Sequence, residues 1–141
     1  MKYYFENNAM IFKFKGKVHD KIILYNINFK KHIKVLHSEM TLTKIEEILK
    51  YPDYIYKHSN KTSSYHYEKD YGEDTYRVTV GKYKKGIKVV ITAYKVINKD
   101  EYTVKHVHCV YNKESQEKYV NKIKKLKNDM NYFYEIFNIA K

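Results

Sequence analysis

Apolar and lysine residues alternate along residues 10–15, where the sequence reads MIFKFK. A period of two places the apolar side chains on one face and the charged ones on the other, which is typical of a half-buried strand. Residues 21–28 form a second apolar run, KIILYNIN, which the short connection GKVHD joins to the first. The pattern therefore predicts two strands in this part of the chain.

The hydrophobic period changes to about 3.6 residues over residues 42–50. Three apolar residues fall on one face of a helix there: Ile45, Ile48 and Leu49. Thr43 and Glu46 have the spacing of a capping box. Pro52 limits the helix on the other side, because the residue before a proline avoids the α region. We therefore predict a short helix over residues 42–50.

Alternation with a period of two returns after this helix. The strands that it predicts cover residues 54–58, 63–70, 75–80, 87–97 and 102–111. Short connections between strands favour antiparallel hairpins. The strand over residues 87–97 has the longest apolar run of the five, which indicates a central position in the sheet.

Residues 114–138 return to helical spacing, with lysines opposite the apolar positions. Strands in one block with helices at the margins indicate an α+β fold. A chain of 141 residues is typical of one domain. We therefore expect a single domain over residues 1–141, with an antiparallel sheet of four to six strands, a short helix packed on it and a C-terminal amphipathic helix.

The charge balance favours polyanionic partners. Lysine and arginine number 28 against 16 acidic residues, a net charge of +12, and an excess of that size favours binding to polyanions through counterion release. Arg77 is the only arginine, so flexible lysines, which suit phosphate contact, supply the rest of the charge. The 17 tyrosines can pack in a core or stack on bases. A composition inherited from an AT-rich genome would explain the same counts without a nucleic-acid role.

Compartment signals are few. Cys109 is the single cysteine, so no intramolecular disulfide can form, as is usual in a reducing compartment. The N-terminal segment lacks the apolar core and cleavage site of a secretory signal. No apolar run approaches the ~20 residues of a membrane span. We expect a soluble, cytoplasmic protein with no membrane association.

Residues that could cleave RNA occur in two places. Cleavage without a metal ion needs a base for the 2′-OH proton, an acid for the leaving 5′-oxygen, and donors for the phosphoryl oxygens. Histidine is a residue type suited to the base and acid roles, and His32 and His37 are the candidates here. Thr92 and Tyr94 lie two apart in a predicted strand and share a face. On an ideal helix the two histidines would lie about 140° apart, so they meet only in an irregular segment. Surface or packing histidines and ordinary strand formers explain the same residues.

Other polar strand residues are candidates for substrate binding: Tyr67, Lys69, Arg77 and Lys88. Alternation places Lys88 on the face of Tyr94, and it places His66 and Glu68 on the face opposite Tyr67. His106 and His108 could begin a metal site, but no third ligand has a matching spacing. We therefore expect no metal and no cofactor.

The chain resembles the phage and mobile-element nucleases of the Barnase–EndoU–Colicin E5/D–RelE (BECR) superfamily over residues 30–97. The resemblance rests on the order of five segments: KHIKVLHSEM, IEEILKYPDYIY, SSYHYEKD, YRVTV and VVITAYKVI. It implies a helix packed on an antiparallel sheet, and a toxin-like, metal-independent endoribonuclease that leaves a cyclic phosphate. The substrate would be RNA (tRNA or mRNA), and an antitoxin or immunity protein would be a plausible partner.

Carried over residue by residue, the resemblance assigns His37 and His32 as general base and general acid, in either order. Thr92 and Tyr94 fall in the last strand motif, TAY, and would bind the scissile phosphate with help from Arg77 or a nearby lysine.

The strand that often supplies a further polar group would contribute Tyr67 or Lys69. Leu36 and Ser38 stand where related proteins often have arginine and proline, so one phosphate donor of the family is missing.

Three other function classes fit the same sequence. A non-catalytic nucleic-acid-binding module would use the basic residues and tyrosines without chemistry. A mobile-element protein would dock its lysines on an acidic protein partner. An enzyme of another class would use His106 and His108 with a metal. The oligomeric state stays open, since the Tyr/Phe-rich tail over residues 130–137 could complete the core or pair with a second copy.

Overall fold

The computed structural model describes residues 1–57, 63–97 and 108–114. The chain divides into two units, residues 1–111 and 112–141. The helix expected over residues 114–138 lies outside the described residues, as does most of the strand expected over residues 102–111. The expectation of a single domain therefore stays a prediction.

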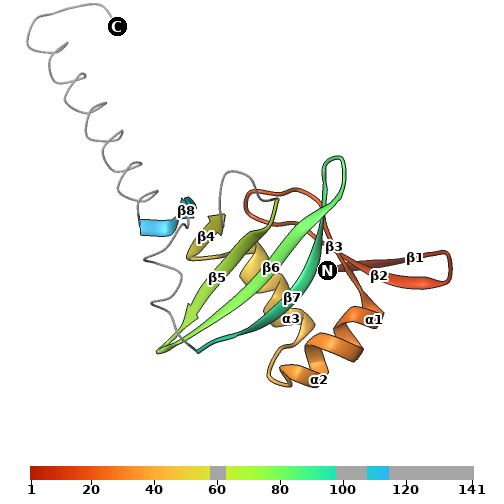
Figure 1. Ribbon diagram of the computed structural model, residues 1–141, viewed down its shortest axis with the longest axis horizontal. Coiled ribbons are helices and arrows are strands. Elements are labelled where there is room, and N and C mark those ends of the chain that lie inside the picture. Colours follow the sequence, from red (N-terminus) through yellow and green to blue (C-terminus); the bar gives the residue numbers. More distant parts are fainter. Residues whose placement is uncertain (58–62, 98–107, 115–141) are drawn as a thin grey trace, which may run out of the picture. The chain divides into compact units, whose positions relative to one another are not determined.

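One sheet organises the first unit, with the strand order β1-β2-β3-β7-β6-β5-β4-β8 (Figure 1). The strands are β1 (Lys2–Glu6), β2 (Ala9–Phe14), β3 (Ile22–Tyr25), β4 (Tyr54–Lys57), β5 (Tyr65–Tyr71), β6 (Asp74–Lys84), β7 (Ile87–Val96) and β8 (His108–Asn112). Consecutive strands within β1–β3 and within β4–β7 pair antiparallel, whereas β3 joins β7 in parallel. The α+β class is confirmed, but within the described residues the sheet has eight strands rather than four to six.

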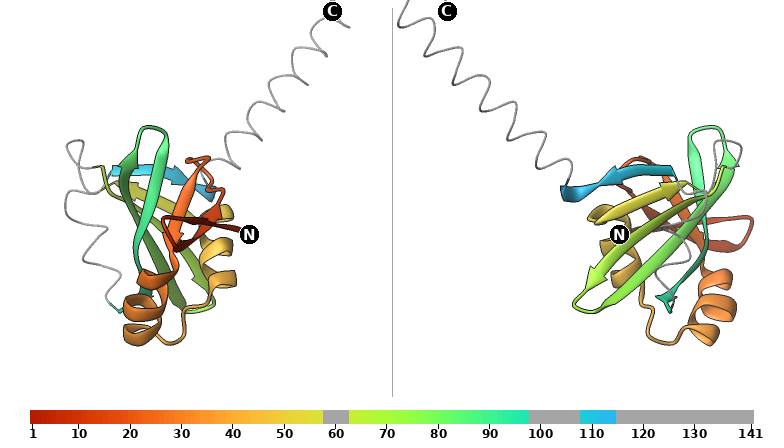
Figure 2. Two further views of the ribbon diagram at one scale, coloured as in Figure 1. Left: turned by 90° about the vertical axis from the view of Figure 1, so that its right-hand side faces the viewer. Right: turned by 60° about the vertical axis from the view of Figure 1, so that its left-hand side comes forward.

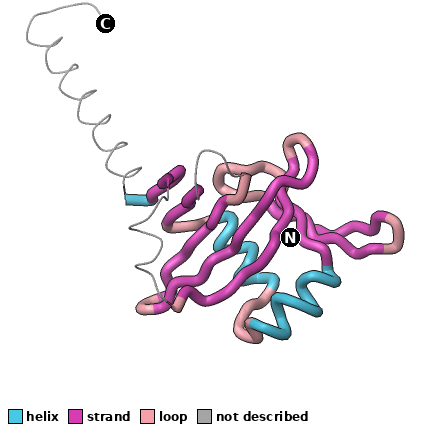
Figure 3. The backbone as a smooth tube through the Cα atoms, in the orientation of Figure 1, coloured by secondary structure: helices cyan, strands magenta, loops and turns pink. Residues whose placement is uncertain are grey.

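A helical segment that the sequence did not predict follows β3. It consists of α1 (Asn26–Asn28), the wider π-helical turn η1 (Phe29–Ile33) and α2 (Lys34–Leu36) (Figure 3). The apolar run suggested a strand as far as residue 28, but β3 ends at Tyr25. The Asn28 side-chain amide then donates to the carbonyls of Val90 and Ile91, at 3.1 and 3.2 Å. A side chain thus bonds to β7 where a longer β3 would have continued the pairing.

The helix α3 (Leu42–Lys50) has the predicted bounds but a different cap. Thr41 is extended, and its hydroxyl accepts a hydrogen bond from the Lys44 amide at 3.1 Å. Thr43 lies inside the helix, so the capping box predicted at Thr43 and Glu46 is wrong. An N-cap must leave the helical region while its oxygen accepts an amide bond from the first turn, and here Thr41 does so.

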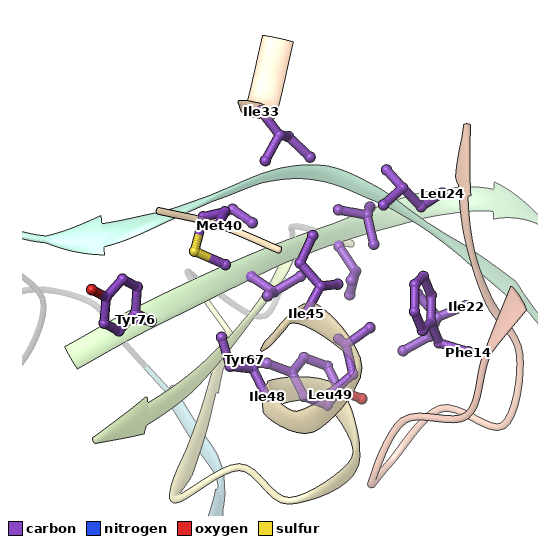
Figure 4. Close-up of a cluster of buried hydrophobic side chains, with 14 of the residues drawn as sticks. Phe14, Ile22, Leu24, Ile33, Met40, Ile45, Ile48, Leu49, Tyr67 and Tyr76 are labelled. Atoms are coloured by element: carbon purple, nitrogen blue, oxygen red, sulfur yellow. The ribbon is translucent and has the colours of Figure 1, made fainter. Parts of the chain in front are cut away.

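The helix α3 lies against one face of the sheet (Figure 2), and the buried apolar side chains of the two form the hydrophobic core. Ile45, Ile48 and Leu49 are fully buried on the predicted face of α3. Figure 4 shows them beside Tyr67 of β5, with Ile33 from η1 in the same cluster. The helical face predicted from periodicity therefore packs against the sheet. Within the described residues, no helix is long and apolar enough to cross a membrane.

The strand β1 was also missed. Four of its five side chains are exposed, so burial imposes no alternation that the sequence could reveal. A turn at Asn7 and Asn8 joins it to β2, and both residues have positive φ, 49° and 65°. Two such residues form the type I′ turn that suits a two-residue hairpin, and asparagine tolerates this conformation.

Two glycines provide a matched test of packing. A Cβ at Gly16 would lie 2.5 Å from Ile22 Cδ1 and 2.9 Å from the Tyr67 hydroxyl oxygen, and both neighbours are fully buried. We expect Gly16→Ala to lower the free energy of unfolding by about 1–3 kcal/mol, as overpacking does. Urea unfolding measures this change.

The control is Gly81→Ala. Its Cβ would meet only the side chain of Ile91, 2.6 Å from Cδ1, and Ile91 is 48% exposed and can turn into solvent. A change within about 0.5 kcal/mol is expected there. Equal losses in the two variants would contradict this account.

Candidate active site on the polar face of the sheet

Two rows of polar side chains cross strands β4–β7 on the face opposite α3. Strand register makes the members of each row direct neighbours, and alternation separates them from the core residues of the same strands. We call these the polar rows: the first contains Tyr54, Glu68, Arg77 and Tyr94, and the second contains Tyr56, His66, Thr79 and Thr92.

A buried ion pair occupies the middle of the first row. Arg77 is 1% exposed, and its Nη2 lies 2.9 Å from Glu68 Oε1. Its Nη1 donates to the Tyr94 hydroxyl oxygen at 2.8 Å. Burial acts to lower the pKa of Arg77, but the Glu68 carboxylate and Tyr94 outweigh it, so the net pKa is raised. The guanidinium therefore stays charged, and it fixes the Tyr94 hydroxyl by donating to it.

His37 reaches the same row from the end of α2. Its ring is tilted against the Tyr94 ring, with centroids 5.6 Å apart, and the residue is half-buried. The His37 amide donates to the Ile33 carbonyl at 2.8 Å, and Ile33 is anchored in the core. Because Asn28 ties the start of the same segment to β7, the helical segment runs beside this strand and ends at Tyr94.

The second row is held by a histidine–threonine hydrogen bond. His66 Nδ1 lies 2.9 Å from Thr79 Oγ1, and both residues are nearly buried. Thr92 is the neighbour of Thr79 across the register. Burial, followed by the charge of Glu68, raises the pKa of Tyr56, so this tyrosine remains a hydroxyl donor at neutral pH.

A register shift in β7 moves Lys88 away from this face. Thr79 pairs with Thr92 but Val80 pairs with Val90, so the irregularity falls at Ile91. The alternation expected from the sequence is reversed there, and the placement of Lys88 on the face of Tyr94 is wrong. Lys88 instead lies on the core side, with its ammonium 5.1 Å from the centre of the Tyr65 ring.

The structure also separates other sequence candidates from the polar rows. Tyr67 is fully buried in the core. Lys69 donates to the Tyr51 carbonyl at 2.9 Å. His32 is exposed, and no hydrogen bond, ion pair or ring contact joins it to the described part of the chain. Of the eight predicted site residues, His37, Thr92, Tyr94 and Arg77 lie together.

Tyr67 has a different polar partner. Its hydroxyl oxygen is 2.6 Å from His19 Nδ1 and 3.4 Å from the Val18 amide. Burial, with a smaller effect of the Lys88 charge, lowers the pKa of His19 to about 4, while burial raises the pKa of Tyr67. An uncharged phenol and a neutral imidazole therefore share this hydrogen bond at neutral pH, and the pair ties the β2–β3 connection to the core.

Most members of the polar rows were not identified from the sequence. Alternation placed His66 and Glu68 on one face but indicated no role for them, because their partners on β4 and β6 depend on strand register. The signal was the alternation of polar residues in consecutive strands, each with an apolar set on the opposite face. The register of β4–β7 shows which of these alternating polar residues are neighbours across the strands, and these neighbours form the two rows.

Comparison with known proteins identifies no relative from which a role for this site could be inferred. No protein-family model matches the chain, and neither a curated protein nor a solved structure is found to be similar to it. Within the described residues, no group of three or more His, Cys, Asp or Glu side chains is placed to hold a metal ion.

The ion pair predicts a coupled effect on stability. Arg77→Met leaves the Glu68 carboxylate buried without its counterion, and breaking a buried pair in this way costs about 3–5 kcal/mol. We expect the double variant Arg77→Met/Glu68→Leu to recover much of that loss. A double-mutant cycle by urea unfolding measures the coupling. Additive losses in the double variant would argue against a coupled pair.

The neutral His19 predicts a pH dependence. In the unfolded chain histidine titrates near its ordinary pKa of about 6.5, but in the folded protein its pKa is about 4. As pH falls from about 6.5 to about 4, His19 binds a proton in the unfolded state but stays neutral in the folded state. The free energy of unfolding therefore decreases. Partial exposure of the ring moderates the effect.

Most carboxylates stay ionised between pH 7 and pH 5, and comparison with a His19 variant separates this residue from the other six histidines. We expect the parent protein to lose more stability over this interval than His19→Gln does, measured by unfolding at each pH. An identical pH dependence in the two proteins would exclude His19 as the cause.

Proposed function

We propose that the polar rows and His37 form the active site of a metal-independent endoribonuclease. The observation that carries the proposal is the chain of contacts from Glu68 through Arg77 and Tyr94 to His37. It combines a permanently charged anchor, a fixed hydroxyl and a half-buried histidine at one place. The net charge of +12 would attract the polyanionic substrate.

In this mechanism His37 takes the proton from the 2′-OH of RNA, and the oxygen then attacks the adjacent phosphorus. The bond to the 5′-oxygen breaks, and a general acid supplies its proton. The products are a 2′,3′-cyclic phosphate and a 5′-hydroxyl. Tyr94 donates to a phosphoryl oxygen, where negative charge builds in the transition state.

Arg77 is a positioning residue in this proposal. Its side chain is almost wholly buried and donates to Tyr94, so it orients that hydroxyl rather than contacting RNA. Thr92 lies in the adjacent row and is half-buried, which suits a second phosphate donor.

The general acid has two candidates. The resemblance to the BECR nucleases suggested His32, which is exposed and has no contact with the polar rows in the described part of the chain. His66 belongs to the second row and is oriented by Thr79. Because an acid must share a face with the base and the phosphate donors, we assign the role to His66.

The resemblance to toxin-like nucleases of phages and mobile elements extends the proposal. It would make tRNA or mRNA in the cytoplasm the target, and an antitoxin or immunity protein the inhibitory partner. That extension rests on the sequence segments alone, whereas the assignment of the active site rests on the geometry.

His37 can be tested against a matched histidine. Purified protein is incubated in EDTA with total tRNA and with a synthetic mixed-sequence RNA, and the product ends are analysed. We expect His37→Ala and His66→Ala to lose about 10²–10⁴-fold in cleavage rate, as for a general acid or base. Tyr94→Phe is expected to lose about 10²-fold or more, and His32→Ala to cleave at the parental rate.

Thermal unfolding of each variant controls for loss of structure. Cleavage by His37→Ala at the parental rate would remove His37 from the mechanism. If the parent leaves RNA intact but shifts it on a gel, the protein is a binding module. If it does neither, a search for an acidic protein partner follows.

A further inference from the structure

We propose that the outer strand β1 pairs with β1 of a second copy of this chain to form a homodimer. β1 is the last strand of the described sheet on its side, and the β1–β2 hairpin extends away from the remaining strands (Figure 1). An edge strand has a row of backbone donors and acceptors that can pair with another chain. This proposal is independent of the proposed nuclease activity.

The protective features that usually guard an edge are missing from the centre of β1. Its sequence is KYYFE, with charges only at the ends and no proline. Tyr3 and Phe5 are 63% and 66% exposed, and their rings contact each other edge to face at 6.4 Å. An exposed aromatic pair on an edge strand without these protective features favours association, because a partner would bury the rings and pair the backbone.

The sequence of β1 is complementary to itself. In an antiparallel pair with a two-fold axis at Tyr4, Lys2 of one copy faces Glu6 of the other at both ends. Tyr3 faces Phe5 of the second copy, and the two Tyr4 residues meet on the axis. Opposite charges and aromatic pairs directly across strands each stabilise a sheet.

The backbone permits this register. Glu6 and Ala9 flank the two-residue turn, and residues in that position form a hydrogen-bonded pair. Bonding toward β2 then alternates along β1, so the amides and carbonyls of Tyr3 and Phe5 point outward. Those two residues face each other in the proposed dimer, so their outward groups can exchange both bonds.

Strand register also places two like charges opposite each other within one protomer. Lys2 lies directly opposite Lys13 of β2, and like charges in that position destabilise a strand pair. Glu6 of the second copy would place a carboxylate on the outer side of Lys2. Lys2 and Lys13 together therefore favour a carboxylate beside Lys2, and Glu6 of the second copy would supply it.

The expected dimer is weak. A five-residue edge and its aromatic side chains make a small interface, so association in the micromolar-to-millimolar range is expected. Sedimentation of the full-length protein over a concentration series measures it. We expect Lys2→Glu and Glu6→Lys each to weaken self-association about 10-fold or more, because both end pairs become repulsive.

Mixing the two variants is the decisive measurement. Every end charge of Lys2→Glu then faces an opposite charge of Glu6→Lys, so the mixture should recover parental association as a heterodimer, as should the doubly substituted chain. Lys2→Glu places an acid opposite Lys13, so it is not expected to harm folding, and a thermal melt checks this. A monomeric parent, single variants that still associate, or a mixture that fails to recover would each overturn the proposal.

Discussion

The burial of one charged side chain organises the central sheet. A guanidinium that is 1% exposed has lost its hydration, and such a group is tolerated only when charges and hydrogen bonds compensate it. Glu68 on β5 and Tyr94 on β7 supply these bonds to Arg77 on β6. Three strands are thereby joined through side chains as well as backbone, and one face of the sheet is committed to polar residues. The apolar residues of the same strands are left to the opposite face, where α3 packs.

The edge of β7 determines which other elements reach this polar face. β3 pairs with β7 only at Lys88 and Val89, and the Asn28 side chain takes over at the next two carbonyls. The helical segment beside β7 therefore begins with a polar anchor on the strand and is fixed further along by buried Ile33. His37 meets Tyr94 because both ends of this segment are held. The irregularity at Ile91 acts in the same direction, since it turns Thr92 and Tyr94 away from the core while Val90 stays in it.

Hydrophobic periodicity predicted the helices and strands that bury one face. It failed where an element buries neither face or where a side-chain hydrogen bond sets the end of a strand. The helix α3 and the strands β4–β7 were found because their apolar residues repeat with the correct period. The strand β1 was missed because it buries neither face, and α1–α2 because an asparagine side chain, rather than a change of hydrophobic period, ends β3. Register was also beyond the sequence. His37, Thr92, Tyr94 and Arg77 were identified by residue type, but their proximity depends on one register shift, while Lys88 was misplaced by that same shift.

The strand order keeps the two ends of the sheet independent. β2 and β3 separate β1 from β7, so a second copy bound along β1 would extend the sheet without entering the polar rows. The polar rows and the edge strand β1 also differ in how strongly their side chains depend on one another. Replacing one member of the buried row changes the charge balance of the others, because each is the other's counterion or hydrogen-bond partner. The contacts at the outer edge are of a weaker kind: the Tyr3 and Phe5 rings meet edge to face and the Lys13 ammonium lies over the Tyr4 ring. Within the described residues, Lys2 and Glu6 form no ion pair. That difference is the physical reason for proposing chemistry at one region and association at the other.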